Sequence, residues 1–113
     1  MKTAFIYNNL EYKEDKPAVT ILLETSFTKE IRITLKKNQI MKEHHAPFPI
    51  VVHIIEGKID FGVDNRILKL EKGGLIALES SVPHDLRAEE DSIIRLTLNK
   101  ADKASRVEKV ITK

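Results

Sequence analysis

The stretch "HHAPFPIVVHIIEG", residues 44–57, combines histidines with strong structural signals. Two adjacent histidines precede a Pro-Phe-Pro sequence, and an almost purely apolar run then leads to Gly57. A short apolar run that ends at a glycine is typical of a strand buried on both faces. Proline cannot donate to a β ladder, so Pro47 and Pro49 indicate a distortion before this strand. We therefore expect a buried strand with histidines at its entrance.

Short strand candidates with turn signals between them surround this stretch. They are residues 19–24, which are apolar on both faces, and residues 30–36, 58–63, 66–70, 75–78 and 92–98. In the second of these, Ile31, Ile33 and Leu35 share one face, as expected of a half-buried strand. Asp64-Asn65 is hairpin turn chemistry. Closely spaced strands without a convincing helix before residue 99 predict an all-β sandwich or barrel.

The tail, residues 99–113, has a different pattern. Its apolar residues recur at roughly helical spacing, and Asn99 is a candidate N-cap, so we expect a short C-terminal helix. A strand over residues 107–112 is the competing interpretation. A chain of 113 residues fits one domain, in which residues 1–98 form the β body and residues 99–113 the tail.

The composition excludes several classes of function. The net charge of +2 gives no electrostatic argument for a nucleic-acid or membrane partner. The absence of cysteine excludes thiolate metal sites and cysteine nucleophiles. The sequence contains no Gly-x-Ser-x-Gly motif and no Gly-rich phosphate loop. Neither a signal peptide nor an apolar run long enough to span a membrane is present, so we expect a cytoplasmic protein.

Two motifs near the histidines resemble those of a known family. Counting back from Gly57 in the pattern His-x-His, three or four residues, Glu, six residues, Gly places His44 at the first histidine, Ala46 at the second and Ile50 at the glutamate. The stretch "KGGLIALESSVPH", residues 72–84, resembles the second motif and ends at His84. In that motif Glu79 stands in place of proline, and Ser81 in place of glycine. The pattern resembles the small single-domain cupins, including a subtype with His-x-Ala-Pro-x-Pro-Ile.

The resemblance implies a double-stranded β-helix, or jelly-roll barrel, with a pocket between its sheets. The implied pocket residues are His44, Ala46, Ile50, Val52 and His84. His44 and His84 would be the ligands of one divalent ion (Zn, Fe, Ni or Cu). Because Ala46 and Ile50 replace the other two ligands of the family, this ion is an optional cofactor. His45 and Glu79 are secondary ligand candidates. Strand alternation directs His45 away from His44, and Glu79 lies in the turn before His84, where it either folds inward or stays solvated.

The strand after the prolines has a second apolar face. If Ile50, Val52 and Ile54 point into the barrel, then Val51, His53 and Ile55 point outward. An apolar outer face needs cover from a second sheet, the N-terminal segment or a partner chain. The family resemblance implies a homodimer through this face.

Three functions remain open from the sequence. The first is a binding module that holds a small organic ligand in the barrel, with or without a divalent metal. The second is a metal-dependent enzyme, dioxygenase-like or isomerase-like, with a reduced histidine set. The third is a non-catalytic structural or regulatory homodimer with a vestigial site. The sequence does not decide whether the protein is an enzyme.

Overall fold

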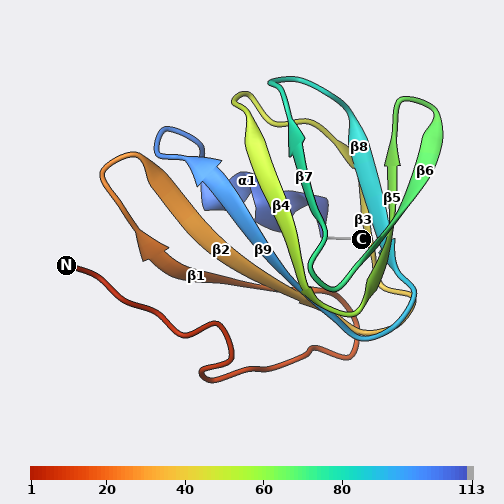
Figure 1. Cartoon of the computed structure of the whole chain (residues 1–113), viewed down its shortest axis with the longest axis horizontal. Coiled ribbons are helices and arrows are strands. Elements are labelled where there is room, and N and C mark those ends of the chain that lie inside the picture. The colour runs from red at the N-terminus through yellow and green to blue at the C-terminus, as the bar shows by residue number, and fades with distance from the viewer. Residues whose placement is uncertain (112–113) are drawn as a thin grey trace.

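Two antiparallel sheets face each other in the computed structural model, which describes residues 1–111 (Figure 1). The larger sheet has the order β1 (Ala18–Glu24), β2 (Thr28–Leu35), β9 (Ser92–Asn99), β4 (Ile50–Glu56) and β7 (Leu75–Leu78). The smaller sheet has the order β3 (Ile40–His44), β8 (His84–Ala88), β5 (Lys58–Val63) and β6 (Arg66–Glu71). One helix, α1 (Ala104–Val110), follows the last strand. The expected jelly-roll architecture is confirmed.

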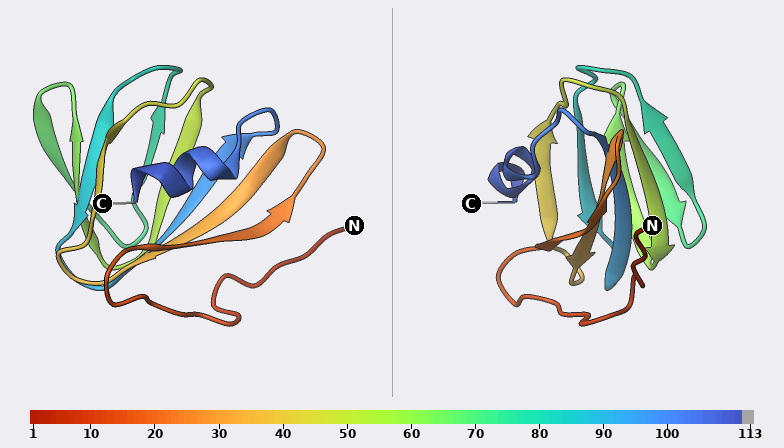
Figure 2. Two further views of the ribbon diagram at one scale, coloured as in Figure 1. Left: turned by 180° about the vertical axis from the view of Figure 1, so that it is seen from behind. Right: turned by 90° about the vertical axis from the view of Figure 1, so that its left-hand side faces the viewer.

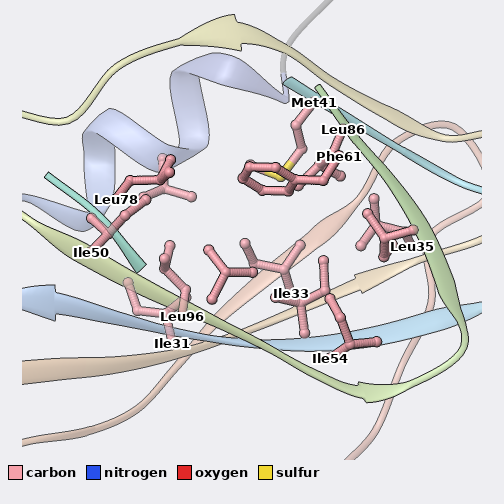
Figure 3. Packing of buried hydrophobic residues seen from close by; sticks show 14 of the residues in the cluster. Ile31, Ile33, Leu35, Met41, Ile50, Ile54, Phe61, Leu78, Leu86 and Leu96 are labelled. Atoms are coloured by element: carbon pink, nitrogen blue, oxygen red, sulfur yellow. The ribbon is translucent and has the colours of Figure 1, made fainter. Parts of the chain in front are cut away.

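The core fills the space between the two sheets. Ile31, Ile33 and Leu35 of β2 are almost completely buried, as their alternation predicts. Figure 3 shows them facing Met41 and Phe61 of the smaller sheet. Each such side chain contributes about 1.5–3 kcal/mol when it is fully removed from water. These apolar layers hold the two sheets together.

The N-terminal segment covers part of the outer face of the larger sheet (Figure 2). Arg32 is buried on this face and donates from Nη1 to the carbonyl oxygens of Ile6 (2.8 Å) and Asn8 (2.9 Å). Thr34 donates from Oγ1 to the carbonyl oxygen of Glu11 at 2.7 Å. The cover over β2 is therefore the chain's own first residues.

One strand is less buried than expected, and two others, β3 and β8, were not predicted. Residues 19–24 are apolar on both faces and therefore predict a buried strand, but β1 is an edge strand and Ile21 is 50% exposed. The edge position leaves one side of β1 without a neighbouring strand. β3 escaped prediction because its sequence, "IMKEH", lacks apolar alternation.

The expected C-terminal helix forms, but its start differs from the prediction. α1 begins after Lys103, which makes no side-chain cap hydrogen bond. The prediction that Asn99 caps the helix is wrong, because Asn99 Oδ1 accepts from the Ala101 backbone N–H in a separate turn (2.8 Å). The competing strand interpretation fails for residues 107–110, which are helical, and Thr112 lies outside the described residues. Over residues 1–111, no helix has the length and hydropathy of a membrane span.

Candidate functional site

Two imidazoles meet on neighbouring strands of the smaller sheet. His44 ends β3 and His84 begins β8, and the antiparallel register places the two residues directly opposite each other. Their ring centroids are 4.2 Å apart, with an interplanar angle of 61°. Phe61 of β5 stacks on the other side of His84, with centroids 5.6 Å apart and planes 8° apart. Histidines forty positions apart in the sequence thus form one contact inside the barrel.

A β-bulge in β3 directs two residues of this strand into the same interior. Between Met41 and His44 the register shifts, so that three steps along β3 match two steps along β8. Strict alternation would place Met41 and His44 on opposite faces because their separation is odd. The extra residue of a bulge restores a common face. Met41 is buried and His44 is half-buried, whereas Lys42 and Glu43 between them are exposed.

Backbone hydrogen bonds fix the protonation of both rings. His44 Nδ1 lies 2.7 Å from the Lys42 carbonyl oxygen, and His84 Nδ1 lies 2.9 Å from the Val82 carbonyl oxygen. A carbonyl oxygen only accepts, so each Nδ1 carries a proton and donates it. Burial lowers the pKa of His44 to about 4 and also lowers the pKa of His84. Both rings are therefore neutral near pH 7, and each retains a free acceptor at Nε2.

The two rings line a small and mostly apolar cavity. Its volume is about 20 Å³, which is room for one water molecule. Most of the lining is aliphatic, and the polar groups in it come from His44, His84 and Arg106. α1 supplies Arg106 and Val107 as part of one wall, and it packs against β3 and β1 across the open side between the sheets (Figure 2).

Arg106 is held in place by a buried carboxylate. Its Nε and Nη2 atoms donate to the two oxygens of Asp102, each at 2.8 Å. The Asp102 side chain is 1% exposed, and Lys29 Nζ donates to its backbone carbonyl oxygen. Arg106 Nη1 makes only a long contact of 3.5 Å with the His45 carbonyl oxygen among the described hydrogen bonds. Asp102 therefore compensates the positive charge of the Arg106 side chain that lines the cavity.

The residues expected at the pocket occupy different positions. Ile50 and Val52 line the cavity together with the two imidazoles. Ala46 is buried in the core but is not part of the lining. His45 and Glu79, the secondary ligand candidates, are exposed. The structure therefore does not bring either secondary candidate to the histidine pair.

The outward residues of β4 are partly buried. Val51, His53 and Ile55 alternate with the buried interior residues of the strand. His53 lies between Arg95 of β9 and Leu75 of β7 in the sheet register. Its Nδ1 atom is buried and has no hydrogen-bond partner within residues 1–111. The N-terminal segment reaches this strand at its far end, where Tyr7 donates to Glu56 at 2.6 Å.

Comparison with known proteins bears on the fold. The sequence matches no protein-family model and no curated protein. An RmlC-like cupin from Desulfovibrio desulfuricans superimposes with a TM-score of 0.77 at 19% identity, covering 88% of this chain and 96% of that one. KdgF from Halomonas sp. gives a TM-score of 0.77 at 13% identity, covering 94% and 99%. A cupin 2 conserved barrel protein from Leptotrichia buccalis gives 0.72 at 26% identity, covering 80% of this chain and 44% of that one.

The chain is a small cupin-type barrel. Its structural relatives share the jelly roll, and at these identities the likeness concerns the fold alone. Because one fold hosts many functions, the function has to be argued from the site.

The donor set of this cupin barrel does not fit a divalent ion held in the family's usual way. Within residues 1–111, no group of three or more His, Cys, Asp or Glu side chains is placed to hold a metal ion. The family's second imidazole and its carboxylate correspond to Ala46 and Ile50, which offer no donor atom. A first-row divalent ion normally takes three or four protein ligands. Two imidazoles in an apolar wall fall short of that number.

Several cavity residues had no signal in the sequence. Met41 lies in the unpredicted strand, and a bulge turns it inward. Phe61 lies in the strand predicted at residues 58–63, but its stacking on His84 depends on the order of strands in the sheet. Arg106 sits in the tail, whose docking place a single sequence does not give.

Proposed function

We propose that this cupin barrel is a binding module for a small, largely apolar molecule that carries a hydroxyl or N–H donor. The observation that supports this most directly is the commitment of both Nδ1 atoms to backbone carbonyls, 2.7 and 2.9 Å away. It leaves two Nε2 acceptors for the cavity. A typical hydrogen bond contributes about 0.5–1.5 kcal/mol net, so a ligand that donates to Nε2 gains affinity.

The apolar walls define the rest of the ligand. Ile50, Val52 and Leu96 line the cavity opposite the histidines, and no carboxylate takes part in the lining. Such walls favour a ligand with an aromatic or aliphatic body. They offer no partner to a positively charged group on the ligand. Phenols and short alcohols match this combination of one donor and an apolar body.

Entry of such a ligand requires α1 to move. Ligand pockets in proteins have volumes of about 300–1,000 Å³. The cavity here is about 20 Å³, and α1 forms part of its wall. Displacement of Val107, which is 2% exposed, would enlarge the space beside the two imidazoles. We therefore treat the described conformation as the closed form of the binding module.

Two matched probes test the proposal. Phenol can donate to Nε2, whereas anisole has a similar body without the donor. With chelator-treated, untagged protein we expect phenol to raise the melting temperature and anisole to leave it unchanged. His84→Leu should lose the phenol response. His45→Gln should keep it, because His45 is exposed and outside the cavity. Equal responses to phenol and anisole, or a response retained in His84→Leu, would contradict the proposal.

The same proposal includes a homodimer. Val51, His53 and Ile55 form a half-buried strip on the outer face of β4, and Leu75 beside it is 59% exposed. A second copy of the chain would cover this strip through a two-fold contact, in which equivalent residues face one another. The expectations of a cytoplasmic location and of no nucleic-acid or membrane partner stay predictions.

A further inference from the structure

The cavity contains a hydrogen-bond donor as well as the two imidazole acceptors. Arg106 of α1 lines it together with His44 and His84, and the other lining residues are apolar. Nε and Nη2 of Arg106 are both committed to Asp102. Nη1 makes only the long contact of 3.5 Å with the His45 carbonyl oxygen among the hydrogen bonds of residues 1–111. Arg106 therefore retains donor capacity at Nη1.

The two imidazoles are close enough to share one partner. A backbone carbonyl oxygen accepts the Nδ1 proton of each ring, which leaves Nε2 as the acceptor. The rings lie opposite each other in the β3–β8 register, with centroids 4.2 Å apart. A single nitrogen that donates to two acceptors at about 2.9 Å each spans acceptors up to about 5 Å apart. One small group that carries two hydrogens therefore fits between the rings.

We propose that the ligand of this cavity is a neutral primary carboxamide, R–CO–NH₂. Its NH₂ group donates one hydrogen to His44 and the other to His84, and its carbonyl oxygen accepts from Arg106. The apolar group R lies against the aliphatic wall of the cavity. This inference rests on the proposed binding of a small donor molecule and names the head group of that molecule.

Other head groups match the three polar side chains less completely. A hydroxyl has one hydrogen and leaves one imidazole without a partner. An ammonium group brings a positive charge to a lining that contains Arg106 and no carboxylate. A carboxylate accepts from Arg106 but has no hydrogen for either imidazole. Of these groups, the primary amide alone supplies two donors and an acceptor without a charge.

Competition with water strengthens the requirement for two donors. The cavity volume of about 20 Å³ is room for one water molecule, which carries two O–H donors. A ligand that displaces water without reproducing its hydrogen bonds loses affinity. The amide NH₂ reproduces both donors from a single atom.

Two probes of nearly the same shape test the head group. Benzamide and acetophenone share the ring and the carbonyl, and differ only in NH₂ against CH₃. Isothermal titration calorimetry of chelator-treated, untagged wild-type protein should show benzamide binding at least about tenfold more tightly than acetophenone. Equal affinities of the two probes, no measurable binding of benzamide, or tighter binding of benzoate than of benzamide would overturn the proposal.

Substitutions in the cavity assign the contacts. His44→Leu and His84→Leu should each reduce the ratio of benzamide affinity to acetophenone affinity, a ratio that is insensitive to a general loss of stability. Arg106→Lys, which retains a positive charge next to Asp102, should weaken both probes about two- to tenfold because both present a carbonyl. Ser105→Ala, at an exposed position of α1, is the control and should bind like the wild type. An unchanged ratio in His84→Leu would overturn the proposal, and unchanged affinities in Arg106→Lys would overturn the contact with Arg106.

The outcomes separate this inference from the proposed function. A phenol response of the wild type without a preference for benzamide over acetophenone would overturn only the carboxamide head group. Absence of the phenol response together with no binding of benzamide would overturn both.

Discussion

At the level of single residues, the site depends on how two histidines place their protons. His44 and His84 each donate from Nδ1 to the carbonyl oxygen two residues earlier in the chain. The two rings therefore have the same tautomer and present the same acceptor. Burial keeps them uncharged, and the apolar lining supplies no competing partner. These features favour a ligand that brings a hydrogen-bond donor over one that brings a carboxylate.

The lowered pKa values predict a specific loss of stability in mild acid. The unfolded chain binds a proton at each histidine below about pH 6.5, whereas folded His44 resists protonation down to about pH 4. The stabilisation is complete above about pH 6.5 and is lost as the pH falls toward 4. For His44 we expect a loss of about 1–2 kcal/mol between pH 7 and pH 5, reduced from the full shift because the ring is partly exposed.

Urea unfolding of chelator-treated protein at the two pH values measures this loss. The lowered pKa of His84 adds to it with the same sign. A variant with His44→Leu and His84→Leu should show a smaller difference between the two pH values. Identical pH dependence in the variant and the wild type would contradict the assignment.

At this scale the sequence predicted part of the site. The motifs singled out both histidines, His44 by counting back from Gly57 and His84 as the last residue of the second motif. Met41 could not be found in the same way, since strand alternation alone directs it away from the side of His44. The bulge that reverses this depends on the pairing of β3 with β8, which is a tertiary property.

At the level of elements, the turn between β4 and β5 requires glycine. Gly57 has φ +96°, and a Cβ there would lie 2.1 Å from Ser92 Oγ and 2.7 Å from Ser92 Cα. We expect Gly57→Ala to destabilise the protein by more than about 1–3 kcal/mol, the cost of backbone strain alone. Gly73→Ala is the matched control, because its φ is +91° and its Cβ would meet nothing within 4 Å. Urea unfolding compares them, and equal losses would contradict a steric role of Ser92.

The docking of α1 depends on few contacts. The helix lacks a side-chain N-cap and acidic residues in its first turn, so tertiary packing must stabilise it. Val107 is its buried residue. We expect Val107→Ala to weaken the docking by about 2 kcal/mol and to accelerate hydrogen exchange in α1 more than in β2 and β9. Ser105→Ala, at an exposed position, should leave exchange unchanged. Uniform acceleration throughout the molecule would contradict a separately moving helix.

The sequence predicted an element correctly where one local property of the sequence, such as turn residues or apolar spacing, determines it. The β5–β6 hairpin was predictable because Asp64 (φ 52°) and Asn65 (φ 59°) tolerate the left-handed conformation of its turn. The tail helix was predictable from its apolar spacing. Its N-cap was not, because the Asn99 side chain found a closer partner in the Ala101 N–H. The burial of β1 was overestimated because strand order decides which strand lies at an edge.

At the level of the whole molecule, the outer faces of the two sheets differ. The smaller sheet carries ion pairs on its outer face, among them Arg87 with Asp60 and Lys69 with Asp60. The larger sheet carries the half-buried strip of β4, with an ion pair beside it, Arg95 with Glu30. Charged pairs favour contact with water, whereas the apolar strip favours a partner. We therefore expect the proposed homodimer to use the larger sheet.

Light scattering after size-exclusion chromatography tests this arrangement. We expect the wild type to have the mass of two chains. His53→Asp should dissociate it, because a two-fold contact would bring two carboxylates together. Ile67→Asp is the control, since Ile67 is 66% exposed on the smaller sheet. A monomeric wild type, or a dimer that persists in His53→Asp and dissociates in Ile67→Asp, would contradict the proposed interface.

The most direct measurement of the central claim is the tautomer of the two histidines. Long-range ¹H–¹⁵N correlation spectra of metal-free protein at pH 7 distinguish a protonated Nδ1 from a protonated Nε2. We predict that His44 and His84 both appear as neutral rings protonated at Nδ1, with Nε2 unprotonated. A charged ring at this pH, or protonation at Nε2 of either residue, would contradict the account of the cavity as a site with two free nitrogen acceptors.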